Sequence, residues 1–222
     1  MDITNQGTIH CGLTAILLLS GMDPNIKDAD STPFILSIMM NRIPNAKLYI
    51  DAGVDPNITM GKDGATALYV AANHYHNDMV KLLIERGAGV NKKCIRGRET
   101  ALSGAIEAGN IMAIELLLEN GADYFECDAE CRSSLQIAAN YDNENVANFL
   151  VEKGNFNLDV MDKHARTALH VAAKNNSLKV AKILINAGAN ISLKTEDWET
   201  ALSIAIKEKH KEMENLLRCI SL

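Results

Sequence analysis

The hydrophobic positions of this chain recur as a short apolar segment that begins with a hydroxyl residue and returns every 33 or 34 residues. The segments read T-P-F-I-L-S-I, T-A-L-Y-V-A-A, T-A-L-S-G-A-I, S-S-L-Q-I-A-A, T-A-L-H-V-A-A and T-A-L-S-I-A-I, and they start at Thr32, Thr66, Thr100, Ser133, Thr167 and Thr200. A nearly constant period of this size indicates a stacked repeat protein, in which each repeat packs against its neighbours.

Each repeat predicts two helices. The hydroxyl residue can accept from the free N–H groups in the first turn of the first helix, and small residues such as Ala71 and Ala72 allow close packing. Leu82 and Leu83 exemplify the apolar seam of the second helix, and Pro44 fits the first turn of its own second helix. We expect these residues to cap the second helices: Asn77, Asn110, Asn143 and Ser177. Glycines in phase predict where second helices end: Gly21, Gly53, Gly87, Gly121, Gly154 and Gly188.

These residues resemble the ankyrin repeats, whose unit reads D-x-x-G-x-T-P-L-H-x-A-A-x-x-G-H-x-x-V-V-x-L-L-L-x-x-G-A-D-V-N. K-D-G-A-T-A-L-Y-V-A-A from Lys62, continuing through M-V-K-L-L-I-E-R-G-A-G-V-N to Asn91, matches closely, as does D-K-H-A-R-T-A-L-H-V-A-A from Asp162. The resemblance covers residues 8–222. It implies an all-α fold with short β-hairpin loops, an ankyrin-repeat solenoid of stacked helix-turn-helix units.

We therefore expect a single ankyrin-repeat domain over residues 1–222. Its parts are a partial N-terminal repeat over residues 1–26, repeats over residues 27–60, 61–94, 95–127, 128–161 and 162–194, and a C-terminal capping repeat over residues 195–222.

The chain departs from the family pattern at the hairpin turn. The turn glycine is present only as Gly64, and we expect altered or strained turns where other residues replace it: Asp30, Arg98, Cys131, Ala165 and Trp198. The repeat that includes Ser133 departs furthest, with Tyr124 and Phe125 in its hairpin. Of the leading repeat, only the second helix, around residues 9–20, is evident.

Composition favours an interaction module with an aliphatic core. The chain is 47% apolar but only 5% aromatic, and its net charge is −6. Its Lys and Arg residues are dispersed, which argues against nucleic-acid binding. No stretch is long enough for a membrane span, and no Lys or Arg precedes the apolar N-terminal segment, so we expect no signal peptide. An odd number of cysteines, five, fits reduced thiols in the cytoplasm, or in the cytosol of a host cell for a translocated protein.

Signatures of catalysis are absent from the sequence. It contains no phosphate-binding or dinucleotide-binding glycine motif, no H-E-x-x-H and no G-x-S-x-G. We expect no catalytic residue, cofactor or metal site, because Cys127 with Cys131 and His74 with His76 are pairs without a visible third ligand. The resemblance implies a structural role for His170, through bonds to its Thr and the neighbouring backbone.

If the chain folds as the family does, the hairpin tips and the exposed side of the first helices form a groove. Residues at these positions are the candidate partner contacts: Met39, Met40, Lys62, His74, Tyr75, Arg96, Glu99, Arg132, Tyr141, Lys163, His164, Arg166, Lys174 and Trp198. A basic segment is followed by an acidic one, Glu196, Asp197 and Glu199, so we expect a polypeptide ligand with acidic and basic stretches. The alternatives are a merely solvated charged face and, for Trp198, packing against Lys163 or Ala165.

The sequence thus predicts a non-enzymatic, monomeric scaffold that binds a protein partner and neither nucleic acid nor membrane. Two alternatives stay open: a targeting or substrate-recognition module of a larger protein, such as a microbial effector delivered to a host cell, and an unrecognised enzyme. The resemblance also implies hydroxylation of hairpin asparagines in animal cells, at Asn25, Asn57 and Asn91, where hydrogen bonding within the hairpin is the competing expectation.

Overall fold

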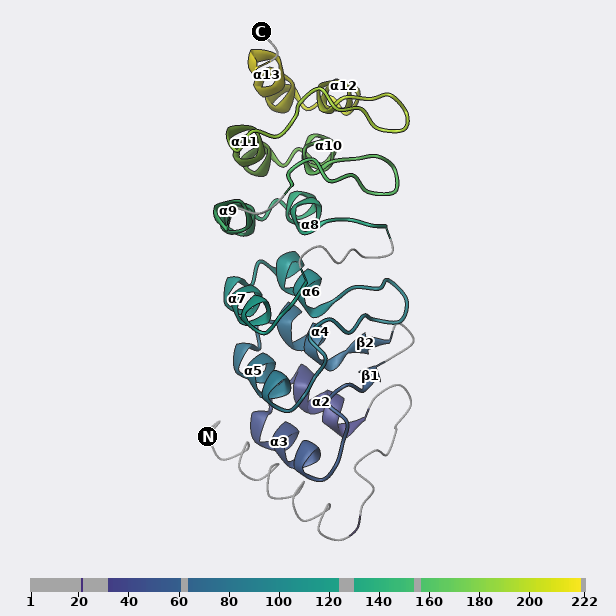
Figure 1. Ribbon diagram of the computed structural model, residues 1–222, viewed down its shortest axis with the longest axis vertical. Coiled ribbons are helices and arrows are strands. Elements are labelled where there is room, and N and C mark those ends of the chain that lie inside the picture. The colour runs from purple at the N-terminus through teal and green to yellow at the C-terminus, as the bar shows by residue number, and fades with distance from the viewer. Residues whose placement is uncertain (1–20, 22–31, 61–63, 124–129, 154–156, 221–222) are drawn as a thin grey trace, which may run out of the picture. The chain divides into compact units, whose positions relative to one another are not determined.

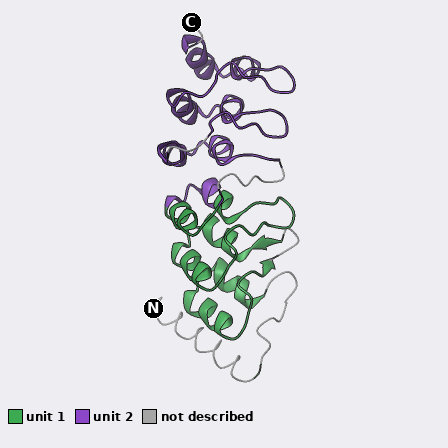
Figure 2. Ribbon diagram, viewed as in Figure 1, with its two compact units in different colours: residues 1–104, 112–122 green, residues 105–111, 123–222 purple. Residues whose placement is uncertain are grey.

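The computed structural model describes residues 21, 32–60, 64–123, 130–153 and 157–220. The chain divides into two compact units, one with residues 1–104 and 112–122 and the other with residues 105–111 and 123–222 (Figure 2). The first is called unit 1 and the second unit 2. Helices α6 (Ala101–Ala108) and α7 (Ile111–Glu119) contribute residues to both units.

In its described residues, unit 1 contains two complete helix pairs joined by a β-hairpin. The pairs are α2 (Pro33–Met39) with α3 (Ile43–Asp51) and α4 (Ala67–Asn73) with α5 (Asn77–Glu85). Between them, β1 (Thr59–Met60) pairs antiparallel with β2 (Ala65–Thr66), and Thr59 lies opposite Thr66. The helices stack in register, because α2 contacts α4 and α3 contacts α5.

Unit 2 contains three such pairs. They are α8 (Ser134–Asn140) with α9 (Glu144–Glu152), α10 (Ala168–Asn175) with α11 (Leu178–Asn186), and α12 (Ala201–Lys207) with α13 (Lys211–Ile220). The first helices contact one another in the order α8, α10, α12, and the second helices in the order α9, α11, α13. The hairpin loops extend from the first-helix layer (Figure 1). The predicted fold class, all-α with short β-hairpin loops, is confirmed.

The first helices begin where the hydroxyl residues predict. Thr66 Oγ1 accepts from Tyr69 N–H at 3.1 Å, and equivalent bonds to the third helical residue are made by Thr32, Thr100, Ser133 and Thr200. The small residues on these helices permit close approach as expected. A Cβ on Gly104 would lie 2.8 Å from two atoms of the Tyr69 ring, so a larger residue would clash.

The expected caps of the second helices are wrong in their chemistry. Asn143 and Ser177 occupy the N-cap positions of α9 and α11, but neither makes a side-chain capping bond. Instead, Asn143 Nδ2 donates to Ile106 O at 2.6 Å and Ser177 Oγ donates to Ala139 O at 2.7 Å. These acceptors lie near the end of the first helix of the preceding repeat, so the side chains join successive repeats.

In α5 the expected cap is one residue out of place. His76 is the N-cap, and its Nδ1 lies 2.9 Å from Ile38 O, which belongs to the preceding first helix. Asn77 is the first residue of the helix, and its Nδ2 donates to Met112 Sδ at 3.6 Å. His210 repeats the arrangement of His76, with Nδ1 lying 3.0 Å from Ala173 O.

Backbone conformations confirm the predicted stops and turns. Left-handed φ angles occur at Gly53, Gly87, Gly121 and Gly188, which follow second helices, and also at Gly21; Gly154 and the residues before Gly21 lie outside the described residues. At the hairpin turn, the residues that replace glycine keep a left-handed φ between 55° and 61°: Arg98, Cys131, Ala165 and Trp198. These turns therefore carry backbone strain, since a Cβ disfavours that region. Asp30 lies outside the described residues.

Candidate functional site

The hairpin over residues 162–166 is closed by one buried carboxylate. Asp162 Oδ1 accepts from the N–H groups of His164 and Arg166, both at 2.9 Å, and Oδ2 accepts from Arg166 Nε at 2.8 Å. Burial of Asp162 raises the pKa of its carboxyl group, but these hydrogen bonds and the charge of Arg166 lower it more. The net pKa of Asp162 is below its ordinary value, so the carboxylate stays ionised and holds the turn.

In the next hairpin, over residues 195–199, Thr195 occupies the position that corresponds to Asp162. Thr195 N–H donates to Glu199 O at 2.9 Å, and Glu199 N–H donates to Thr195 Oγ1 at 3.3 Å. The two hairpins are also joined to each other, because Glu196 N–H donates to His164 O at 3.3 Å. Successive hairpin tips of unit 2 therefore form a connected edge that positions their side chains.

Between these hairpins and the first helices α10 and α12 lies a groove of about 360 Å³, called here the large hollow. Its lining is His164, Arg166, His170, Lys174, Thr195, Glu196, Asp197, Glu199, Ile204, Lys207 and Glu208. Apart from Ile204, these side chains are polar or charged. A groove with such a lining suits an extended polar chain better than a compact apolar ligand.

A second groove of about 140 Å³, called here the small hollow, adjoins the first. Its lining is Glu130, Arg132, Asn140, Arg166, Val171, Lys174 and Asn175. Arg166 and Lys174 line both hollows, so the two are contiguous within unit 2. The structure thus brings together five predicted contact residues: Arg132, His164, Arg166, Lys174 and, through its bond to Glu130, Lys163.

Several polar and charged side chains at this site already bind one another. Lys163 Nζ lies 2.6 Å from Glu130 Oε2, and His164 Nδ1 lies 2.6 Å from Glu196 Oε1. Such exposed pairs are worth little individually, but they link each hairpin to its neighbour. Lys207 Nζ lies 2.7 Å from Glu199 Oε1, and both residues line the large hollow. In contrast, Lys174 forms no ion pair within the described residues.

His170 forms the buried floor of the large hollow. Its Nδ1 accepts from Thr167 N–H at 3.1 Å, and its Nε2 donates to Leu193 O at 3.0 Å. Burial lowers the pKa of His170 below its ordinary value, and the neutral ring satisfies both bonds. Gln136 takes the equivalent place one repeat earlier, accepting from Ser133 N–H at 2.8 Å. The structural role expected for His170 is confirmed.

Trp198 stands at the tip of its hairpin and is 78% exposed. Lys194 Nζ lies 5.3 Å from the centre of its ring, within the range of a cation–π contact. The contact that the structure shows for this ring is thus with Lys194 from the same loop. The indole leaves a large apolar surface in solvent beside the hollow residues Asp197 and Glu199.

The remaining predicted contacts are more scattered. Met39, Met40 and Tyr75 in unit 1 and Tyr141 in unit 2 have exposed side chains. His74 and Arg96 are exposed and Glu99 is half-buried, while Lys62 lies outside the described residues. The rings of His74 and His76 have centroids 5.9 Å apart. Among the described residues, no group of three or more His, Cys, Asp or Glu could hold a metal ion; Cys127 lies outside them.

Sequence reasoning missed Ile204, Lys207 and Glu208, which α12 and its end contribute to the large hollow. The signal was present, because Lys207 follows Lys174 by one repeat period. It also missed Asp162, whose role depends on the folded turn.

The repeat geometry and the sequence now decide the family. The family model described as ankyrin repeats (3 copies) matches residues 4–94, 38–128, 102–197 and 135–220. The chain belongs to the ankyrin-repeat family. Ankyrin repeats are protein–protein interaction modules that bind protein partners, and the family is in general non-catalytic.

Similar curated proteins are much longer than this chain. The human SH3 and multiple ankyrin repeat domains protein 2 is 28% identical over 193 residues, 86% of this chain and 10% of that protein. Mouse inversin is 30% identical over 144 residues, 64% of this chain and 14% of inversin. The BRCA1-associated RING domain protein 1 of Caenorhabditis elegans is 40% identical over 86 residues, 39% of this chain and 12% of that protein.

The hairpin asparagines of this ankyrin chain bond across repeats. Asn57 Oδ1 accepts from Gly89 N–H at 2.7 Å, and Asn57 Nδ2 donates to Gly87 O at 3.2 Å. Asn91 Nδ2 donates to Gly121 O at 2.9 Å. Bonding within the hairpin is thus corrected to bonding with the following repeat; Asn25 lies outside the described residues.

None of the helices in the described part of the chain combines the length and apolarity needed to cross a membrane.

Proposed function

We propose that this chain is a non-enzymatic scaffold that binds a polypeptide partner along the hairpin side of unit 2. The observation that carries the proposal is the pair of contiguous hollows that share Arg166 and Lys174. Both are lined by first helices and hairpins of successive repeats. A single extended segment of a partner can therefore contact several repeats at once.

The charges of the site support a peptide rather than a small apolar ligand. Small-molecule sites are lined predominantly by apolar and aromatic side chains, whereas Ile204 and Val171 are the aliphatic residues among the linings of the two hollows. Trp198 supplies an exposed aromatic surface next to the polar groove. Tryptophan and arginine are common energetic anchors of protein interfaces.

The test is quantitative capture of partners from a lysate of the source cells, with three variants of the chain compared. Lys174→Glu and Trp198→Ala change the proposed site, while Lys182→Glu makes the same charge change on α11 of the second-helix layer. Lys174 and Lys182 are both exposed. Lys163 and Arg166 are left unchanged, because each belongs to an ion pair whose loss would disturb the hairpins.

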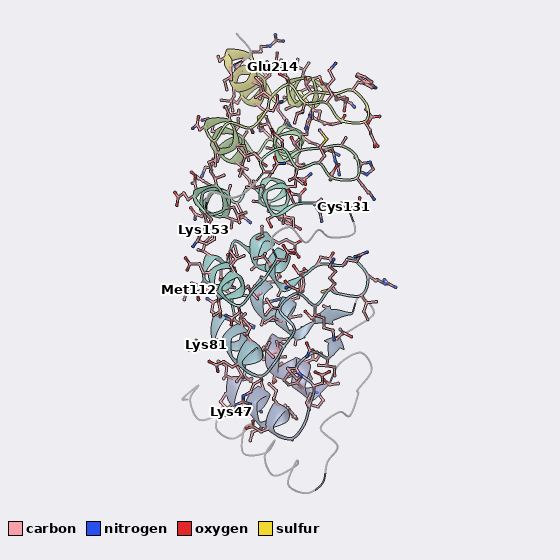
Figure 3. All side chains as sticks on the ribbon, in the orientation of Figure 1. Lys47, Lys81, Met112, Cys131, Lys153 and Glu214 are labelled. Carbon is pink, nitrogen blue, oxygen red and sulfur yellow. The ribbon has the colours of Figure 1, made fainter. Side chains whose placement is uncertain are left out.

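A protein retained by wild type and Lys182→Glu but lost from Lys174→Glu and Trp198→Ala would support the groove as the binding site. Equal retention by every folded variant would contradict it. Circular dichroism and a melting curve verify that each variant is folded. Figure 3 shows the two sides that the comparison separates in unit 2, with Cys131 on the hairpin side and Lys153 at the end of a second helix.

The alternative role, as the targeting or substrate-recognition part of a larger protein, stays a prediction. The cytoplasmic location and the monomeric state are predictions as well. Each is independent of which residues line the groove.

A further inference from the structure

The small hollow has a positive lining in an acidic chain. Its charged residues are Arg132, Arg166 and Lys174 against Glu130 alone, whereas the whole chain has a net charge of −6. Two of these charges bind partners from the neighbouring hairpin residues: Glu130 pairs with Lys163 and Arg166 pairs with Asp162.

The cations of the small hollow differ in how they are held. Arg166 is fixed by two bonds to Asp162 Oδ2, with Nε at 2.8 Å and Nη2 at 2.7 Å. A guanidinium that is already ordered loses little conformational entropy when it binds a ligand. Lys174 is exposed and, within the described residues, has no ion pair to exchange for a new one. An incoming anion would therefore meet one rigid cation and one available cation.

The amide groups of the lining add hydrogen-bond donors. Asn175 Nδ2 donates to Asn140 Oδ1 at 3.0 Å, so the oxygen of Asn140 is occupied and its NH₂ group remains a donor. The volume of about 140 Å³ is several times the roughly 30 Å³ share of one water molecule. The hollow can thus accept a compact oxyanion together with some of its hydration.

The large hollow has the opposite balance. Four carboxylates line it, Glu196, Asp197, Glu199 and Glu208, against the three permanent cations Arg166, Lys174 and Lys207. The charge of the groove therefore changes along its length, from positive toward α8 to negative toward α12. Complementary charges at an interface fix the register of the partner.

We propose that the small hollow binds an anionic oxygen group on the partner polypeptide, either an Asp or Glu carboxylate or a phosphorylated side chain. This inference rests on the proposed function, because it names the chemistry that the partner presents to the same groove. The ligand class is an acidic peptide segment, and its basic residues face the large hollow.

The test uses random linear peptides displayed on phage and selected on the complete chain. Selected peptides are synthesised with Glu, Gln, Lys or phosphoserine at each acidic position, and binding is measured by fluorescence anisotropy. Wild type, Lys174→Glu, Lys174→Gln, Trp198→Ala and Lys182→Glu are compared. The Gln variant keeps the test valid if a carboxylate at the end of α10 disturbs that helix.

We expect enriched peptides with an acidic residue whose change to Gln weakens binding. Lys174→Glu should weaken binding by about tenfold, since it replaces an attraction by a repulsion, and the Glu-to-Lys peptide should bind this variant better than the original peptide does. Lys182→Glu should bind like wild type. The comparison of Glu with phosphoserine identifies which anion the hollow prefers.

Two results would overturn the proposal, and they differ in what else they overturn. Peptides that lose affinity for Trp198→Ala but ignore both the acid-to-Gln change and the Lys174 variants would refute the anion site and leave the groove intact. Peptides that bind every variant equally, or no enriched peptide at all, would refute the groove as the binding site as well.

Discussion

The Asp162 carboxylate binds the Arg166 guanidinium through Oδ2, which lies 2.8 Å from Nε and 2.7 Å from Nη2. Its Oδ1 accepts two backbone N–H groups of the same turn. One buried side chain thus closes the hairpin and also orients a cation that lines both hollows. Stability of the turn and composition of the binding site are coupled at this residue.

Asp162→Asn should lower the free energy of unfolding by about 1–3 kcal/mol, because charge-assisted hydrogen bonds to a buried group are weakened. The folded-state pKa of Asp162 is lowered. Its contribution is therefore present above the ordinary Asp pKa of about 3.9 and is lost as the pH falls through the folded-state pKa. Urea unfolding at several pH values below about 4 should show a shallower pH dependence for the variant. Equal slopes for variant and wild type would contradict this role.

His170→Gln should make stability less sensitive to mild acid. The pKa of His170 is lowered by burial, so the unfolded chain binds a proton more readily than the folded one. Stability from the neutral ring is present above the ordinary His pKa of about 6.5 and is lost as the pH falls below it, by up to about 1.4 kcal/mol per pH unit. Gln can keep the bonding, as Gln136 does in the preceding repeat.

The reciprocal change, Gln136→His, is the matched control for that comparison. It places an imidazole at an equally buried position, and we expect it to add sensitivity to acid below about pH 6.5. Denaturation midpoints measured from neutral pH downwards give both slopes. If neither substitution alters the slope of stability against pH, burial of the neutral His170 ring does not cause the acid sensitivity.

Ala165→Gly should stabilise the chain by about 0.5–1 kcal/mol. Ala165 has a φ of 55°, and the left-handed region costs a residue with a Cβ about 1–2 kcal/mol. Part of the gain is offset, because glycine gives the unfolded chain more freedom. Thermal and urea unfolding of the two proteins measure the difference. A lower midpoint for the glycine variant would show that the turn is not strained.

Gly121→Val should lower the free energy of unfolding by about 1 kcal/mol or more. Gly121 has a φ of 84°, and no heavy atom lies within 4 Å of the position that a Cβ would occupy. The cost therefore comes from the backbone, since a β-branched residue is disfavoured in the left-handed region. Gly121→Ala, measured in the same urea titration, should cost less. An unchanged midpoint for the Val variant would contradict the role of Gly121 as a helix stop.

The predictions from local sequence were accurate because their causes are local. Thr66 caps the first turn of α4 by bonding three residues ahead, and Gly121 ends its helix through its own φ. Asn143 was misassigned for the opposite reason. The local rule expects its side-chain oxygen to accept a backbone N–H of its own helix, but no such bond forms. Its Nδ2 instead donates to Ile106 O, 37 residues earlier in the chain. That carbonyl comes within reach only after the repeats have packed.

The sequence by itself determined the repeat period, the starts of the first helices, the glycine stops of the second helices, the family and the outward positions from which a site can be built. Only the tertiary structure decided that Lys163 and His164 bind carboxylates of neighbouring hairpins and that Lys174 lines two hollows. The physical reason is the range of the interactions. Backbone conformation follows from neighbours within one turn, whereas a long charged side chain finds its partner about one repeat away, through packing.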